Sequence, residues 1–162
     1  MPEIIVLAHN IRSTHNVGAT FRTAEGFGVS RIILSGYTPY PRIPNDTRLP
    51  HITEKLTTQI HKTALGAEQL VPFTYQEAPR LKELSASGYR IVGLEQSPQA
   101  IMLPSYIPTD KIVLILGEEV EGIPGELIDM CDDLIEIPMH GKKESYNVSV
   151  ATGIALYALT TN

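Results

Sequence analysis

Short apolar runs alternate with amphipathic segments along the whole chain of 162 residues. The runs are rich in Ile, Val and Leu and are continuous, a pattern typical of strands buried on both faces of a parallel sheet. Strands are predicted at 4–8, 31–34, 71–74, 90–94, 112–116 and 134–137. Helices are predicted at 16–27, 52–66 and 76–87, from about residue 124, and at 147–160. The alternation favours an α/β fold in a single domain spanning residues 1–162, with a mostly parallel six-stranded sheet and helices on both faces.

Residues that typically begin or end helices and strands refine these predictions. Asn16 is predicted to cap the first helix and Gly28 to end it, because these residue types suit the two positions. Pro72 weakens the strand at 71–74, which is therefore expected at an edge of the sheet. Residues 36–50 contain four prolines, so a long irregular loop is expected there, and loops of that length in compact domains are often functional. A second loop is expected near residues 96–108.

The last predicted helix is apolar on nearly every side. One face is formed by Val148, Ala151, Ile154, Ala155, Ala158 and Leu159. Val150, Leu156 and Tyr157 extend the apolar character to other faces. A helix of this kind is buried on several sides, and at the end of a small domain this indicates a subunit interface.

Composition and charge narrow the class of protein. No apolar run approaches the length of a transmembrane helix, and the start of the chain lacks the pattern of a signal peptide. The single cysteine, Cys131, is expected in a packed helix and suits a reducing compartment, so a cytoplasmic location is predicted. The net charge of −5 is unevenly distributed: residues 1–62 carry seven basic and four acidic residues. A polyanion is therefore expected to meet the N-terminal part of the chain.

Three loops that follow predicted strands are candidates for a ligand site, because ligands bind beyond the carboxyl ends of strands in open α/β sheets. These loops are 94–97, 116–119 and 137–141. No glycine-rich dinucleotide motif follows the first strand, and no phosphate-binding P-loop is present. The His and Cys spacings match no metal site, so no metal is predicted. The pattern favours a cofactor that needs neither a phosphate cradle nor a metal.

Three segments carry the most specific signal: 10–23 (NIRSTHNVGATFRT), 114–124 (LILGEEVEGIP) and 137–151 (IPMHGKKESYNVSVA). In this order and near these spacings they resemble the three motifs of the SpoU (TrmH-like) RNA 2′-O-ribose methyltransferases of the SPOUT superfamily. The segment 62–68 (KTALGAE) is similar to one that many members carry. The resemblance covers nearly the whole chain.

The resemblance implies a fold, an activity and partners. It implies a deep C-terminal trefoil knot, which neither composition nor periodicity indicates and which is rare among folds. It implies transfer of a methyl group from S-adenosylmethionine to a ribose 2′-hydroxyl in RNA, with tRNA placed ahead of rRNA. It also implies a homodimer, in agreement with the apolar last helix.

The resemblance assigns catalytic roles to Arg22, Asn16, Glu119, Ser145 and Asn147. Arg22 matches the arginine of the first motif; since a guanidinium keeps its proton, we expect it to bind the phosphate beside the target ribose and orient the hydroxyl. Asn16 would help to hold the nucleotide, and Glu119 would hold Arg22 or Asn16 in place. Ser145 and Asn147 would order the cofactor loop and contact the substrate.

The resemblance also assigns the cofactor-binding residues. They lie in the loops 94–97 and 116–119 and in the segment 137–151, and are Leu94, Glu95, Leu116, Gly117, Ile137, Met139, Tyr146 and Asn147. Gly117 allows the chain to approach the ligand closely. Position 146 is usually Leu in the family and is Tyr here, a change that a backbone contact survives but that alters the shape of the adenine slot.

Two alternatives stay open at this point. One is a non-catalytic RNA-binding protein on the same scaffold, against which the intact Arg22, Ser145 and Asn147 weigh. The other is a SPOUT enzyme that methylates a base nitrogen, against which the pair Asn16 and Arg22 weighs. Taken singly, the same side chains have structural explanations, as a helix cap or a surface charge.

Overall fold

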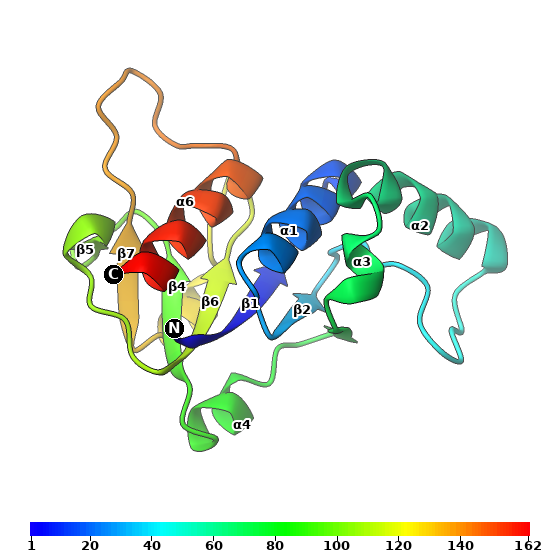
Figure 1. Ribbon diagram of the computed structural model, residues 1–162, viewed down its shortest axis with the longest axis horizontal. Coiled ribbons are helices and arrows are strands. Elements are labelled where there is room, and N and C mark those ends of the chain that lie inside the picture. Colours follow the sequence, from blue (N-terminus) through cyan, green and yellow to red (C-terminus); the bar gives the residue numbers. More distant parts are fainter.

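The computed structural model describes residues 1–162 and contains one seven-stranded parallel sheet of order β3-β2-β1-β6-β4-β7-β5 (Figure 1). The strands are β1 (Glu3–His9), β2 (Arg31–Ser35), β3 (Phe73–Gln76), β4 (Arg90–Leu94), β5 (Ile101–Met102), β6 (Lys111–Leu116) and β7 (Asp133–Glu136). The helices are α1 (Thr14–Gly26), α2 (Pro50–Ala64), α3 (Ala67–Leu70), α4 (Leu81–Ala86), α5 (Gly125–Ile128) and α6 (Val148–Thr161), with a 3₁₀ turn η1 (Leu103–Ser105). No helix combines the length and the apolarity needed to span a membrane.

All six predicted strands are present, but the prediction of a six-stranded sheet is wrong. The seventh strand, β5, has only two residues and lies where a loop was predicted. Ile101 and Met102 are both exposed, so the segment is too short and too open to show a strand pattern. β3 lies at an edge, as predicted, but begins at Phe73. Pro72 has no N–H for the ladder and contributes only its carbonyl, which accepts a hydrogen bond from Ile32 N.

Several predicted helix boundaries are corrected by the structure. Ser13, not Asn16, caps α1: its side chain accepts a hydrogen bond from the Asn16 backbone N–H at 3.2 Å. The predicted end at Gly28 is confirmed by its φ of +67°. The helix predicted at 52–66 ends at Ala64 and is followed by the separate helix α3.

Two further helix predictions were too long. The segment predicted as helix 76–87 is helical only in α4, because β3 extends to Gln76 and Pro79 precedes the helix. The helix expected around Cys131 is also shorter, since α5 ends at Ile128 and leaves Cys131 in the following turn. Burial raises the pKa of the Cys131 thiol to about 11, so a reactive thiolate is not expected there.

Alternate residues of the central strands β2, β1, β6 and β4 face two separate apolar layers. In β1, Ile4 and Val6 belong to the layer beneath α1 and α6, whereas Ile5 and Leu7 belong to the layer beneath α4 and α5. Figure 1 shows α1, α2 and α6 on one side of the sheet and α4 on the other. The expected helices on both faces are therefore confirmed, and α6 packs directly against α1.

Sheet order decides which loops meet. Because all strands are parallel, their carboxyl ends lie along one edge of the sheet. β6 lies between β1 and β4, and β4 pairs with β7, so the segments that follow these strands are neighbours. The segment 137–147 after β7 then leads into α6 and brings the start of α6 to α1.

Candidate functional site

A cavity of about 280 Å³ lies where the carboxyl ends of β4, β6 and β7 meet the start of α6. Its nineteen lining residues come from 94–96, 116–122, 135–139, 144–146 and the first turn of α6. The three strand-end loops predicted to form a ligand site therefore converge on one cavity.

The loop after β6 forms a closed turn that makes one wall of this cavity. Glu118 N donates to Gly122 O at 3.2 Å, and Gly122 N donates to Glu118 O at 2.8 Å. A Cβ at Gly117 would lie 2.4 Å from Ile123 N, and a Cβ at Gly122 would lie 2.1 Å from a carboxylate oxygen of Glu95. A side chain at Gly117 would clash with backbone atoms, and Gly122 has a φ of +72°, so the close approach favours glycine at the first position and the backbone conformation favours it at the second.

Glu95 braces this turn against the loop after β4. One carboxylate oxygen accepts from Gln96 N at 3.0 Å, and the other accepts from Ile123 N at 2.8 Å. Both oxygens are thus committed to backbone donors. Glu95 lines the cavity as predicted, but its side chain holds two of the walls together.

The segment 137–147 closes the third side of the cavity. The Gln96 side chain donates to the carbonyl of Glu144 and ties this segment to the loop after β4. Ser145 and Tyr146 both line the cavity. Asn147 is the N-cap of α6: its Oδ1 accepts from Ser149 N at 2.9 Å and from Ser149 Oγ at 2.6 Å.

A chain of side-chain hydrogen bonds joins the three sequence motifs at the edge of the cavity. Asn16 Nδ2 donates to Glu119 Oε1 at 2.6 Å. Asn147 Nδ2 donates to Asn16 Oδ1 at 3.3 Å. The partners are separated by more than 100 residues in sequence, and they meet because β6 lies beside β1 and α6 packs on α1. Ser13 makes this possible, since by capping α1 it leaves the Asn16 side chain free.

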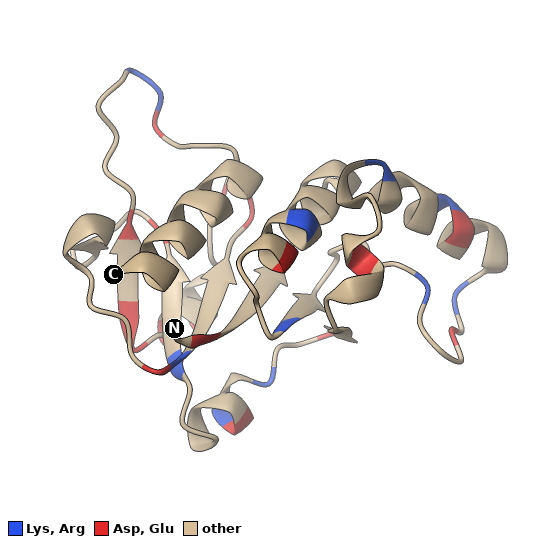
Figure 2. Ribbon diagram, in the orientation of Figure 1, with Lys and Arg blue, Asp and Glu red and all other residues tan.

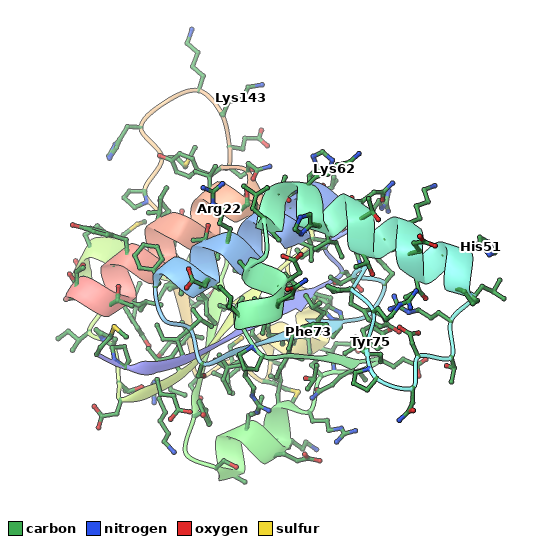
Figure 3. All side chains as sticks on the ribbon, turned by 45° about the vertical axis from the view of Figure 1, so that its right-hand side comes forward. Arg22, His51, Lys62, Phe73, Tyr75 and Lys143 are labelled. Carbon is green, nitrogen blue, oxygen red and sulfur yellow. The ribbon has the colours of Figure 1, made fainter.

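Arg22 lies apart from this network. It is exposed on α1, forms no ion pair and does not line the cavity. Glu119 was predicted to hold Arg22 or Asn16 in place, and it contacts Asn16 and not Arg22. Figure 3 shows Arg22 projecting from α1 on the side of the molecule from which the segment carrying Lys143 protrudes. The guanidinium is therefore available to a ligand that approaches from outside.

The structure brings most of the predicted site residues together. The predicted cofactor residues that line the cavity are Leu94, Glu95, Leu116, Gly117, Ile137, Met139 and Tyr146. Asn147 adjoins it, and Glu119 and Ser145 also line it. Gln96 and Glu118 also line it and lie in the predicted loops 94–97 and 116–119, although neither was assigned a role. Sequence reasoning missed Glu121, Glu136 and Glu144. The signal for these three glutamates is the excess of acids in residues 63–162, which does not indicate where in the fold they meet.

The lining has a definite electrostatic character. Six glutamates and no Lys, Arg or His line the cavity. Such a lining attracts a cationic ligand and repels a phosphate-bearing one. Leu94, Leu116, Ile137 and Met139 add an apolar wall that suits a flat ring. No cluster of three or more possible metal ligands is present.

Comparison with known proteins identifies relatives along almost the whole chain. The model of the SpoU rRNA Methylase family matches residues 3–157. A 23S rRNA (guanosine-2′-O-)-methyltransferase RlmB from Nitrosomonas europaea is 33% identical over 159 residues, which cover 96% of this chain and 55% of the relative. A tRNA (guanosine(18)-2′-O)-methyltransferase from Aquifex aeolicus is 32% identical over 155 residues, which cover 96% of this chain and 67% of that relative. The chain thus spans little more than half the length of the first relative.

Solved structures show the same fold. The A. aeolicus TrmH/SpoU tRNA modifying enzyme superposes with a TM-score of 0.80 at 27% identity, over 99% of this chain and 75% of that one. An AdoMet-bound rRNA methyltransferase from Sinorhizobium meliloti gives a TM-score of 0.79 at 24% identity, over 97% of this chain and 55% of that one. The second likeness bears on the fold alone.

Proposed function

The chain belongs to the SpoU rRNA methylase family, and from this premise we propose that it transfers a methyl group from S-adenosylmethionine to a ribose 2′-hydroxyl in RNA. The observation that carries the proposal is the hydrogen-bonded chain Glu119–Asn16–Asn147 at the edge of an acidic cavity. It joins the cavity to the basic N-terminal part of the molecule. The relatives whose names specify a ribose 2′-O-methylation support the ribose over a base nitrogen as the target.

The cavity fits S-adenosylmethionine in charge and in shape. The cofactor has a sulfonium and an ammonium group, a single carboxylate and no phosphate, which suits a wall of glutamates. When bound, it supplies an electrophilic methyl group. Leu94, Leu116 and Ile137 would hold the adenine ring, with hydrogen bonds from the backbone near Gly117 and Tyr146. The Tyr146 side chain is 42% exposed, so its larger ring is accommodated at the cavity mouth.

Asn16 is the residue best placed to hold the target ribose. Its Oδ1 accepts from Asn147 and one of its two Nδ2 hydrogens is given to Glu119, so the orientation of the amide is determined by its partners. The second Nδ2 hydrogen remains for a ribose or phosphate oxygen. We assign Ser145, at the cavity wall, to ordering the cofactor loop.

Arg22 is assigned to the phosphate beside the target ribose. No acidic group neutralises it, and a guanidinium binds a phosphate through two parallel hydrogen bonds. By holding the phosphate, Arg22 would orient the 2′-hydroxyl oxygen in line with the methyl group. The hydroxyl proton would pass to solvent water as the oxygen gains the methyl, and the guanidinium would keep its own proton. Positioning of this kind contributes several of the ~7–11 kcal/mol attributed to proximity in enzymes.

We further propose a homodimer through α6. Val150, Ile154 and Tyr157 form a stripe at helical spacing, and Val150 and Tyr157 are 49% and 62% exposed. Exposed apolar side chains gathered on one helix face indicate a contact with another protein surface. A second copy of the chain is the simplest partner, because two-fold dimers present the same patch to each other.

The trefoil knot is also a proposal. β7 pairs with β4 on one side and β5 on the other, so the segment that leaves it emerges between loops laid down earlier in the chain. Passage of this segment through an earlier loop, before α6 begins, would knot the chain. Pulling the unfolded protein by its ends tests this, since a knotted chain extends less than the full contour of 162 residues.

We propose tRNA ahead of ribosomal RNA as the substrate; relatives of both kinds match the chain, one from A. aeolicus named for tRNA and one from N. europaea named for 23S rRNA. Mapping of 2′-O-methyl sites in RNA from cells with and without this protein tests the activity and names the nucleotide. Calorimetry with a chelator present tests the cofactor. Binding of S-adenosylmethionine that disappears on chelation, or RNA binding with no methyl transfer, would contradict the proposal.

A further inference from the structure

A second groove lies on the other side of the start of α1, and the mechanism above does not use it. Its volume is about 670 Å³, larger than that of the cofactor cavity. It is formed by Arg12 and Ser13 before α1, by 36–40 after β2, and by side chains of α2 and β3. No Asp or Glu lines it. The groove and the cavity thus have opposite electrostatic character. They are connected through the start of α1, since Asn16 contacts Glu119 of the cavity wall.

Two side chains in the groove have no structural partner. The Arg12 guanidinium makes no ion pair, and it lies over the Tyr37 ring, 5.7 Å from the ring centroid. Tyr37 is 50% exposed, although its backbone N–H is held by Asn10 Oδ1 at 3.1 Å. A ring on a well-anchored backbone, with a free cation beside it, presents one flat apolar face and one anion-binding group to solvent.

The far wall of the groove is rigid. The Arg48 guanidinium lies 3.5 Å from the Tyr40 ring centroid, and Tyr40 stacks on Tyr75 at 4.1 Å. Arg48 also donates to both carboxylate oxygens of Asp46, and this contact holds the pKa of Asp46 below its ordinary value. These groups are satisfied within the protein, so the wall keeps its shape and leaves Arg12 and Tyr37 as the recognition groups.

The groove lies close to the proposed site of reaction. Arg12 is four residues from Asn16, so the two are separated by at most about 14 Å of extended chain. Stacked nucleotides repeat about every 3.4 Å along a strand, so this span corresponds to no more than about four nucleotides. Figure 2 shows Lys and Arg on α1, on α2 and in the loop between β2 and α2, each accompanied by an acidic residue on the same element. Residues 36–64 carry four basic and two acidic residues, so the charge of this part of the chain is positive in balance.

We propose that this groove binds an unpaired nucleotide that flanks the methylated one, with its base stacked on Tyr37 and its phosphate held by Arg12. The inference rests on the proposed function, since it takes RNA as the substrate. An aromatic face and a nearby cation form the combination by which proteins bind single-stranded nucleic acid. The groove selects RNA with an unstacked base near the target, such as a loop, and disfavours a continuous duplex.

The test uses the whole protein and a single-stranded RNA of about 12 nucleotides that carries 2-aminopurine, whose fluorescence reports stacking. Tyr37→Ala is expected to weaken binding about ten-fold or more and to abolish the fluorescence change, whereas Tyr37→Phe retains both. Arg12→Gln is expected to reduce the slope of log K against log salt by about 0.7, the value for one phosphate. Arg31→Gln is the matched control, because Arg31 begins β2 at the opposite edge of the sheet.

Binding by Tyr37→Ala within two-fold of wild type, or an unchanged salt slope for Arg12→Gln, would overturn the inference. Both residues are exposed, and melting temperatures equal to that of wild type would show that the variants fold. Methyl transfer by the wild-type protein separates the two proposals. If the wild type transfers methyl groups and RNA binding by Tyr37→Ala equals that of wild type, only the groove proposal fails. If RNA binding depends on Tyr37 but the wild type transfers no methyl group, only the proposed function fails.

Discussion

Asn147 makes two contacts that substitutions can separate. Its Oδ1 caps α6 by accepting from Ser149 N at 2.9 Å, and its Nδ2 donates to Asn16 Oδ1 at 3.3 Å. Asn147→Ala removes both contacts. Asn147→Asp keeps the cap, since a carboxylate accepts the same hydrogen bond and is favoured at a helix N-terminus, but it has no hydrogen to donate to Asn16.

The expected magnitudes differ for stability and for activity. Loss of an Asn cap costs about 1 kcal/mol, which in a domain of this size lowers the melting temperature by about 2–4 °C. Asn147→Ala is therefore expected to melt about 2–4 °C below wild type, and Asn147→Asp at or above the wild-type temperature. Both variants are expected to lose about ten-fold or more in single-turnover methyl transfer, because Asn16 is then held by Glu119 alone.

Circular dichroism gives the melting temperatures, and single-turnover transfer to substrate RNA gives the rates. Asn147→Ala should also weaken S-adenosylmethionine binding in calorimetry, since it loosens the loop that closes the cavity. Ser149→Ala is a suitable control: it removes only the hydroxyl that donates to Asn147 Oδ1 and leaves the cap and the bridge in place. Wild-type turnover in Asn147→Asp would refute the role of the bridge, and an unchanged melting temperature in Asn147→Ala would refute the cap.

Three other perturbations test other parts of the molecule. Arg22→Ala is expected to abolish methyl transfer with little change in cofactor affinity. Arg22→Lys is expected to retain only part of the methyl transfer activity, since an ammonium cannot bind phosphate through a bidentate pair. Wild-type turnover in Arg22→Ala would contradict the ribose-directed mechanism. Tyr157→Asp, on the exposed face of α6, is expected to give monomers in light scattering where the wild type gives dimers; a wild type that is already monomeric would contradict the interface. The hydrogen bond from Arg90 lowers the pKa of Asp133 against the raising effect of burial, so this carboxylate stabilises the fold above the unfolded-state pKa of about 3.9 and less as the pH falls below it. The urea midpoint of wild type should therefore fall more between pH 6 and about pH 3 than that of Asp133→Asn, and parallel falls would contradict the assignment.

Much of the fold was predictable from the sequence because its signals are local. The continuous Ile, Val and Leu runs at 90–94 and 112–116 placed β4 and β6 within a residue of their observed bounds. The last helix was predicted from residue 147, one residue before its observed start, because the apolar run that forms it begins there. Local signals failed where two residues suited one role, as Ser13 and Asn16 did, and where an element such as β5 was too short to show a period.

The meeting of the site residues was decided by the tertiary structure. Sequence motifs indicated Asn16, Glu119 and Asn147 as site residues, but the order of their hydrogen bonds depends on β6 pairing with β1 and on α6 packing against α1. The acidic cavity likewise needed the sheet, since its glutamates come from three strand ends. Pairing between distant strands is selected by the burial of the whole sheet, and no local pattern encodes it. For the same reason the sequence does not indicate the groove at Arg12 and Tyr37, which forms because β1 and β2 lie side by side.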